Sequence, residues 1–206
     1  MLKNALFFGA PSFPAHAGLG ITRENAMKSI CILIVGCALL AACSGNSNIF
    51  AKKQSATAIL APTKGNSVSG TVNFAQKGDM VLVEAKINGL KPNGTNGIHI
   101  HEKGNCSAAD GSSAGGHFNP SSSQHGGAAG TTRHGGDLGN LKADANGYAQ
   151  ISVEVGGISL GTGPNSVTGR AVIVHAGADD LKSQPAGNAS ARAACGLISK
   201  NPDKFF

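Results

Sequence analysis

The 206-residue chain has no tryptophan, a single tyrosine and only 14% charged residues. Its net charge of +6 is not gathered into a run of Lys and Arg, and no aromatic platform accompanies it. Proteins that bind nucleic acids carry such features, so we exclude a nucleic-acid partner. The chain also lacks an apolar run of roughly 20 residues, which a membrane-spanning helix requires.

A shorter apolar run extends from Ile30 to Ala42, with Lys28 before it and the polar residues SGNSN after it. Its length suits the hydrophobic core of a signal peptide. The run leads into LAAC, which resembles the lipobox of bacterial lipoproteins, where the cysteine, here Cys43, receives a diacylglycerol and becomes the new N-terminus. A buried helix of a soluble domain is the alternative, and the flanking lysine and polar residues favour the signal peptide.

This interpretation divides the chain into four parts. Residues 1–26 are an upstream extension or reflect a misassigned start, with Met27 as the alternative first residue. Residues 27–42 are a lipoprotein signal peptide, and residues 43–54 are a lipidated N-terminus with a flexible, polar tether. Residues 55–206 are then the folded domain.

Cleavage before Cys43 would change both the charge and the cysteine content. Residues 43–206 contain 14 Lys and Arg against 10 Asp and Glu, a mildly basic net charge of +4. Cys31 and Cys37 would leave with the signal, so that Cys106 and Cys195 remain beside the lipidated cysteine. Two cysteines in an exported protein indicate one disulfide, whereas two free thiols would be the expectation in the cytosol.

Short apolar runs with a period of two predict strands rather than helices in the folded domain. Gly, Asn and Pro separate them, as in NGLKPNGTNG, and no amphipathic helix stands among them. We predict an all-β fold, a Greek-key sandwich or flattened barrel of about eight antiparallel strands. The alternating or apolar positions are 68, 70, 72 and 74; 81, 83, 85 and 87; 151, 153 and 155; and 171 to 174.

Residues 103–139 do not follow this plan, because they show no period and consist largely of Gly, Ser, Ala and Asn. A loop of this length within a compact domain is usually functional. Its composition buries too little apolar surface to order it, so another interaction must hold it. The candidates within it are Cys106 and three histidines.

The histidines are the strongest chemical signal. His99 and His101 in GIHIH would project from one face of a strand, although such a pair alone is more often a polar surface feature. Asp137 follows the last loop histidine by three residues. Imidazole with carboxylate and without thiolate suits copper and zinc, and six imidazoles are too many for one tetrahedral ion. The six histidines after residue 43 are His99, His101, His117, His125, His134 and His175.

Several separated motifs between about Ser55 and Lys200 resemble those of copper-zinc superoxide dismutases, in particular the bacterial exported lipoprotein type. These motifs are GIHIHEKGNC, GGHFNP, HGG followed by RHGGDLGN, GRAVIVHAGADD and GNASARAACGLI. The resemblance implies one copper and one zinc ion per subunit, with His117 as a bridging imidazolate between them. It places the copper ligands at His99, His101, His117 and His175, and the zinc ligands at His117, His125, His134 and Asp137.

The same resemblance assigns roles to further residues. Cys106 and Cys195 would form the disulfide, and Asp179, rather than its neighbour Asp180, would link a copper ligand to a zinc ligand. The catalytic residues would be His117, which takes up a proton when copper is reduced, and Arg192, which attracts the anionic substrate. Lys182 is a weaker candidate for guidance, because loop lysines are usually solvated.

The implied function is conversion of superoxide to oxygen and hydrogen peroxide in defence of a bacterial cell envelope. The alternative is a noncatalytic copper- and zinc-binding lipoprotein of the same fold. We expect a periplasm-facing protein held at the membrane by its lipid alone, and Ser44 after the lipidated cysteine favours the outer membrane. A homodimer is one alternative for its assembly, which the sequence leaves open.

Overall fold

The computed structural model describes residues 54–200, which form eight strands and no α-helix. The predicted extension, the signal peptide and Cys43 lie outside this range. No helix within residues 54–200 is long and apolar enough to cross a membrane. The strands are β1 (Ser55–Pro62), β2 (Ser69–Lys77), β3 (Met80–Asn88), β4 (Thr95–His101), β5 (Asp137–Lys142), β6 (Ala149–Gly156), β7 (Ala171–His175) and β8 (Arg192–Ser199).

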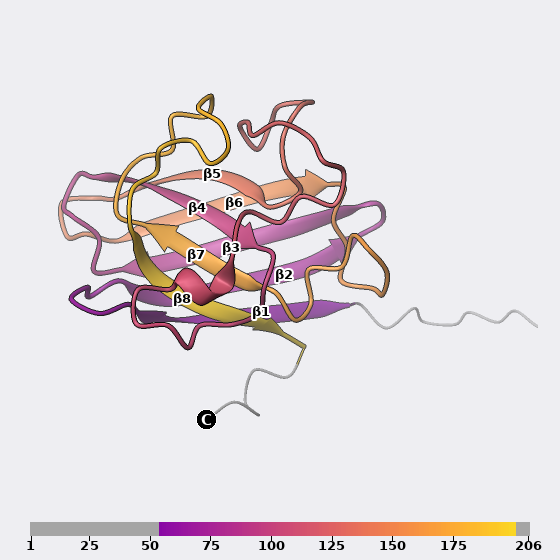
Figure 1. Ribbon diagram of the computed structural model, residues 1–206. Helices are drawn as coiled ribbons and strands as arrows, with labels where there is room; N and C mark the ends of the chain where they lie inside the picture. Colours follow the sequence, from indigo (N-terminus) through magenta and orange to yellow (C-terminus); the bar gives the residue numbers. More distant parts are fainter. Residues whose placement is uncertain (1–53, 201–206) are drawn as a thin grey trace, which may run out of the picture. The chain divides into compact units, whose positions relative to one another are not determined.

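The strands form one antiparallel sheet in the order β5-β4-β7-β8-β1-β2-β3-β6 (Figure 1). Its two end strands, β5 and β6, lie within contact distance of each other, so the sheet nearly closes into a barrel. Consecutive strands β3 and β4 are not neighbours, and neither are β6 and β7, so the chain crosses the barrel between them. The predicted all-β fold with about eight antiparallel strands is therefore confirmed.

The barrel core follows from the alternation in the sequence. In β3, Val81, Val83, Ala85 and Ile87 are buried, while the residues between them are exposed or half-buried. Such alternation places one face of each strand against the core, where burial of apolar surface stabilises the fold. In β6 the pattern is weaker, because only Val155 of the three predicted apolar positions is fully buried.

Strand β4 is buried on both of its faces, as is its neighbour β7. Ile98 and Ile100 belong to the hydrophobic core. His99 and His101 point to the other face and are 0% and 1% exposed. Protein therefore also covers the outer face of β4, and two loops provide this cover.

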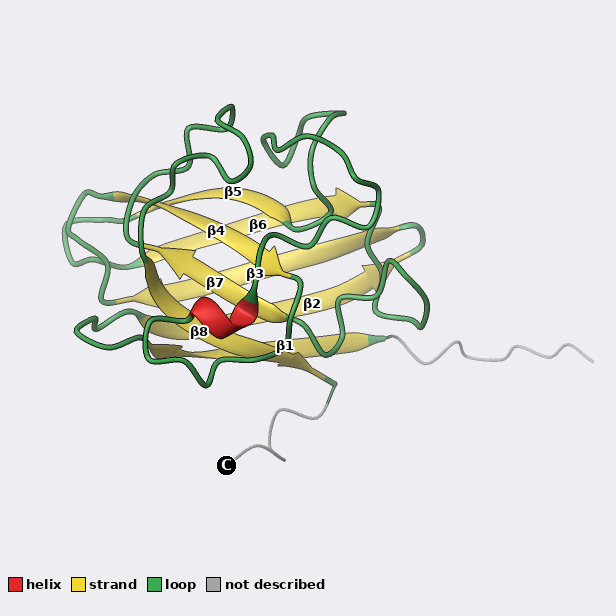
Figure 2. Cartoon of the chain, viewed as in Figure 1, coloured by secondary structure: helices red, strands yellow, loops and turns green. Residues whose placement is uncertain are grey.

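These two loops connect β4 to β5 and β7 to β8, and they lie on the same side of the barrel (Figure 1). We call residues 102–136 the long loop and residues 176–191 the short loop. The prediction that residues 103–139 lack regular structure is wrong in two places. A 3₁₀ turn spans Ser112–Ala114 (Figure 2), and β5 begins at Asp137 because backbone hydrogen bonds of Gly136 to Ile100 and Phe118 bring the chain back to the sheet.

Candidate metal centre

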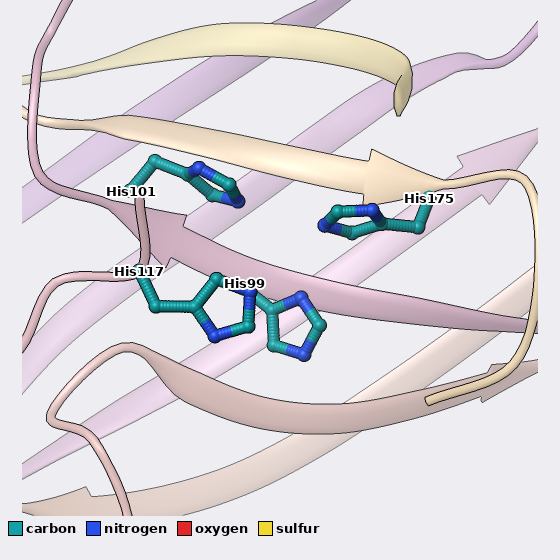
Figure 3. Close-up of side chains that lie close together, drawn as sticks. All are labelled: His99, His101, His117 and His175. Atoms are coloured by element: carbon teal, nitrogen blue, oxygen red, sulfur yellow. The ribbon is translucent and has the colours of Figure 1, made fainter. Parts of the chain in front are cut away.

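Two neighbouring strands supply three of the central histidines. His99 and His101 project from β4, and His175 is the last residue of β7, which pairs with β4 (Figure 3). A register shift between Val174 and His175 interrupts the pairing of β7 with β8 at this point. Such an irregularity re-aims a side chain, here the imidazole of His175.

The fourth histidine comes from the long loop and is placed by its backbone. Gly116 and Phe118, on either side of His117, hydrogen-bond to β4 and to the residue that follows it: Glu102 N–H donates to Gly116 O (2.9 Å), and Phe118 N–H donates to Ile100 O (2.8 Å). His117 thereby forms a bridge with His101. Its ring stacks on that of His99 with the centroids 3.9 Å apart.

Each of the strand histidines is oriented through one ring nitrogen. Nε2 of His99 lies 2.7 Å from Asp179 Oδ2, Nδ1 of His101 lies 2.9 Å from Gly115 O, and Nδ1 of His175 lies 3.1 Å from Ser190 O. These acceptors favour a proton on the bound nitrogen and leave a lone pair on the other.

The remaining nitrogens converge and are buried. His99 Nδ1 and the Nε2 atoms of His101, His117 and His175 have no hydrogen-bond partner among residues 54–200. The four residues offer ligand atoms within 4.8 Å of one another. Buried unpaired nitrogens are rare and need an explanation, and coordination to one ion explains all four. An all-imidazole set of this kind fits copper.

A second group centres on Asp137. Its Oδ1 lies 2.9 Å from His117 Nδ1, 3.1 Å from His125 Nδ1 and 3.3 Å from His134 Nδ1. Its Oδ2 accepts hydrogen bonds from the backbone N–H groups of Gly126 and His134. Three imidazoles and one carboxylate match the tetrahedral N/O coordination of zinc. His117 belongs to both groups and turns Nδ1 to this one and Nε2 to the first.

Asp179 joins the two groups, as the resemblance implied. Its Oδ2 contacts His99, and its Oδ1 lies 2.9 Å from His125 Nε2. Asn140 on β5 fixes its main chain, because the side-chain amide donates to Asp179 O and accepts from Asp179 N–H. Gly187, with a φ of +65°, packs so closely that a Cβ there would overlap the Asp179 carboxylate. The carboxylate thus orients one ligand of each ion.

Arg192 and the disulfide lie beside the copper group. Cys106 and Cys195 form the predicted disulfide, which ties the long loop to β8. The Arg192 guanidinium donates to the carbonyl oxygens of Gly111 and Gly115, and the latter also faces His101. Arg192 is half-buried rather than an exposed surface charge.

The two weaker candidates of the short loop do not reach the metal groups in this geometry. Lys182 is exposed. The Asp180 carboxylate accepts hydrogen bonds from the N–H groups of Lys182 and Ser183 and from the Ser183 hydroxyl, and these bonds lower its pKa to about 2. Asp180 therefore shapes the turn, and Asp179 alone of the pair contacts the histidines.

Burial keeps three of the copper-group histidines neutral. It lowers the pKa of His99 to about 4, that of His175 to about 3 and that of His101 to about 2, and hydrogen bonds to their acceptors offset only part of this effect. Burial raises the pKa of Asp137, but hydrogen bonds from His117 and from backbone amides outweigh it and leave that pKa below its usual value. Neutral imidazole and ionised carboxylate are the forms that bind metal.

These shifts predict that acid destabilises the metal-free protein. The unfolded chain takes up protons on these histidines near pH 6.5, whereas the folded chain does so only near pH 4 and below. Stability should therefore fall as the pH drops below about 6.5, by up to about 1.4 kcal/mol per pH unit for each of the three. Urea unfolding of metal-free protein between pH 7.5 and 5 measures this, and a flat profile would contradict it.

Sequence reasoning did not single out three amides that hold the site. Asn96 donates to His175 O, Asn140 pairs with Asp179, and Gln184 pairs with His125. Asn140 stands in the motif RHGGDLGN, which could have drawn attention to it. The other two follow no pattern in the sequence, because their partners are backbone groups far along the chain.

An antiparallel barrel with two histidine-rich groups that share one imidazole defines a protein with a binuclear copper and zinc centre. The sequence profile described as Copper/zinc superoxide dismutase (SODC) matches residues 68–198. The chain is also 42% identical to the superoxide dismutase [Cu-Zn] of Onchocerca volvulus over 154 residues, which cover 69% of this chain and 96% of that protein. The chain therefore belongs to the copper/zinc superoxide dismutase family.

Proposed function

We propose that this copper/zinc superoxide dismutase is an exported lipoprotein that removes superoxide at a bacterial cell envelope. The observation that supports catalysis is the pair of ligand groups joined through His117. The lipobox-like LAAC before residue 44 supports lipid anchoring, and the Cys106–Cys195 disulfide suits an oxidising compartment outside the cytosol.

The reaction converts two superoxide ions and two protons into oxygen and hydrogen peroxide. Copper, when bound, supplies the alternating one-electron oxidation and reduction. Zinc would be held by His117, His125, His134 and Asp137, and would order the Gly- and Ser-rich part of the long loop. His117 can hold a proton for peroxide at Nε2, the nitrogen that it turns toward the copper group.

Arg192 binds and orients the anionic substrate in this proposal. Its charge lies close enough to the copper group to help lower the pKa values of His101 and His175. Its two carbonyl contacts fix the guanidinium, and the disulfide holds the loop that provides those carbonyls. A fixed cation beside a buried site attracts an anion from solution.

Replacing Arg192 with glutamine should therefore lower kcat/KM about tenfold and flatten its dependence on salt. Steady-state dismutation at 20 and 200 mM salt measures both effects. Lys182→Gln is the matched control, because it removes the same charge from an exposed position in the short loop. Equal losses in the two variants would attribute the effect to net charge and contradict the role of Arg192.

The lipid anchor has its own test. The full chain is expressed in a bacterial host supplied with radiolabelled palmitate, beside a Cys43→Ser variant. We expect label in the outer-membrane fraction for the wild type and unlabelled protein for the variant. An exported but unlabelled wild type would overturn the anchor and leave the enzyme unaffected.

The expected partners are superoxide and, through the lipid alone, the membrane; we expect no nucleic acid. We propose a homodimer as the assembly of the mature chain. Sedimentation of the detergent-solubilised protein over a range of concentrations tests it, and a monomer at every concentration would refute it.

A further inference from the structure

The short loop holds the main chain of one of the zinc-group residues, His125. The N–H of His125 donates to Gln184 Oε1 (2.8 Å), and Gln184 Nε2 donates to His125 O (3.1 Å). The two residues are 59 positions apart in the sequence. The side-chain amide of Gln184 thus pairs with the backbone of His125 in both directions, as a neighbouring strand would.

His125 needs such support because its own segment offers little. It lies between Gln124 and Gly126, outside any strand or helix. Its ring meets Asp137 through Nδ1 and Asp179 through Nε2. Asp179 orients only the ring, however, and the pairing with Gln184 fixes the backbone from which the ring projects.

Gln184 is itself held in place. Its Nε2 also donates to Lys182 O (3.1 Å). Backbone hydrogen bonds from Gly187 N–H to Ser183 O (2.7 Å) and from Asp180 N–H to Gly187 O (2.8 Å) close the short loop around it. Through Asp179, which Asn140 fixes to β5, this loop is anchored on the barrel.

We propose that Gln184 is a positioning residue of the zinc site, whose side-chain amide fixes the backbone of His125 so that its imidazole faces His117, His134 and Asp137. Asp179 of the short loop is bound to β5 and contacts His125 in the long loop. His125 in turn pairs with Gln184, so this series of contacts begins and ends in the short loop. The inference concerns retention of zinc and stands independently of the proposed lipid anchor. Gln184 itself hydrogen-bonds to backbone groups of His125 and Lys182, and not to the ring nitrogens that would bind an ion.

The test is the rate at which the full chain, loaded with copper and zinc, releases zinc to a coloured chelator. Gln184→Met keeps the length of the side chain and removes both hydrogen bonds to His125, together with the one to Lys182 O. Because Gln184 is an exposed residue and its hydrogen bonds to His125 are only part-buried, water competes for them, and we expect zinc release to accelerate roughly three- to tenfold, with copper content unchanged. Release within twofold of the wild-type rate would overturn the proposal.

Ser183→Ala is the matched control, because it removes hydrogen bonds to Asp180 and Asn188 within the same loop and none to His125. We expect it to release zinc at the wild-type rate, and equal acceleration would attribute the effect to loosening of the loop in general. Hydrogen exchange at the His125 amide gives a second readout. It should be slow in the wild type and in Ser183→Ala and fast in Gln184→Met, and fast exchange in the wild type would also refute the pairing.

Discussion

Replacing His175 with alanine should reduce dismutation to below about 1% of the wild-type rate while zinc content stays near one ion per chain. His175 belongs only to the copper group, where it offers a buried Nε2 from the end of β7. The alanine removes one of four imidazoles and leaves the zinc group complete. Metal analysis and activity on the same sample measure the two effects.

His134→Ala is the reciprocal control, because His134 belongs only to the zinc group. It should lose zinc while His99, His101, His117 and His175 still bind copper. Asp137→Ala should likewise loosen the long loop, since both carboxylate oxygens hold parts of it. Equal loss of both metals in the His175 and His134 variants would contradict the division into two groups.

Removal of the Cys106–Cys195 disulfide should lower the free energy of unfolding by about 3 to 5 kcal/mol. The bond closes a segment of 89 residues, so its loss gives the unfolded chain much more freedom. It also releases the loop that carries Gly111 and Gly115, the carbonyl partners of Arg192. Urea unfolding of Cys195→Ser, with metals removed from both proteins, measures the loss.

Cys106→Ser should be destabilised to the same extent, and the double variant no further, because each change breaks the same bond. The single variants should also show the flattened salt dependence expected of Arg192→Gln, although they retain the arginine. Stability within 1 kcal/mol of the wild type would contradict the structural role of the disulfide.

The strands were predictable where one face of the sheet meets the core. The alternating residues of β3 are buried as expected, because a slip by one position would expose all of them. The sequence signal is weaker for β5, since DLGNLK follows a Gly-rich segment and its position depends on hydrogen bonds of Gly136 to distant backbone groups. Hydrogen bonds between segments that are distant in the sequence leave no periodic pattern of apolar residues.

The metal ligands were predictable for a different reason. The chain has seven histidines, and the clustering of His99 and His101 with three loop histidines stood out. Nothing in the sequence indicated that Gln184 would pair with the backbone of His125. Residue type encodes coordination chemistry directly, whereas the supports of the ligands depend on backbone groups that any residue supplies.

Metal content and superoxide turnover, measured on one sample of the oxidised chain loaded with copper and zinc, test the central claim most directly. We predict one copper and one zinc ion per chain and rapid dismutation that slows as salt is added, since the copper and zinc groups share His117 beside the Arg192 charge. Both ions bound without turnover would contradict the assignment of catalysis and indicate a metal carrier of the same fold.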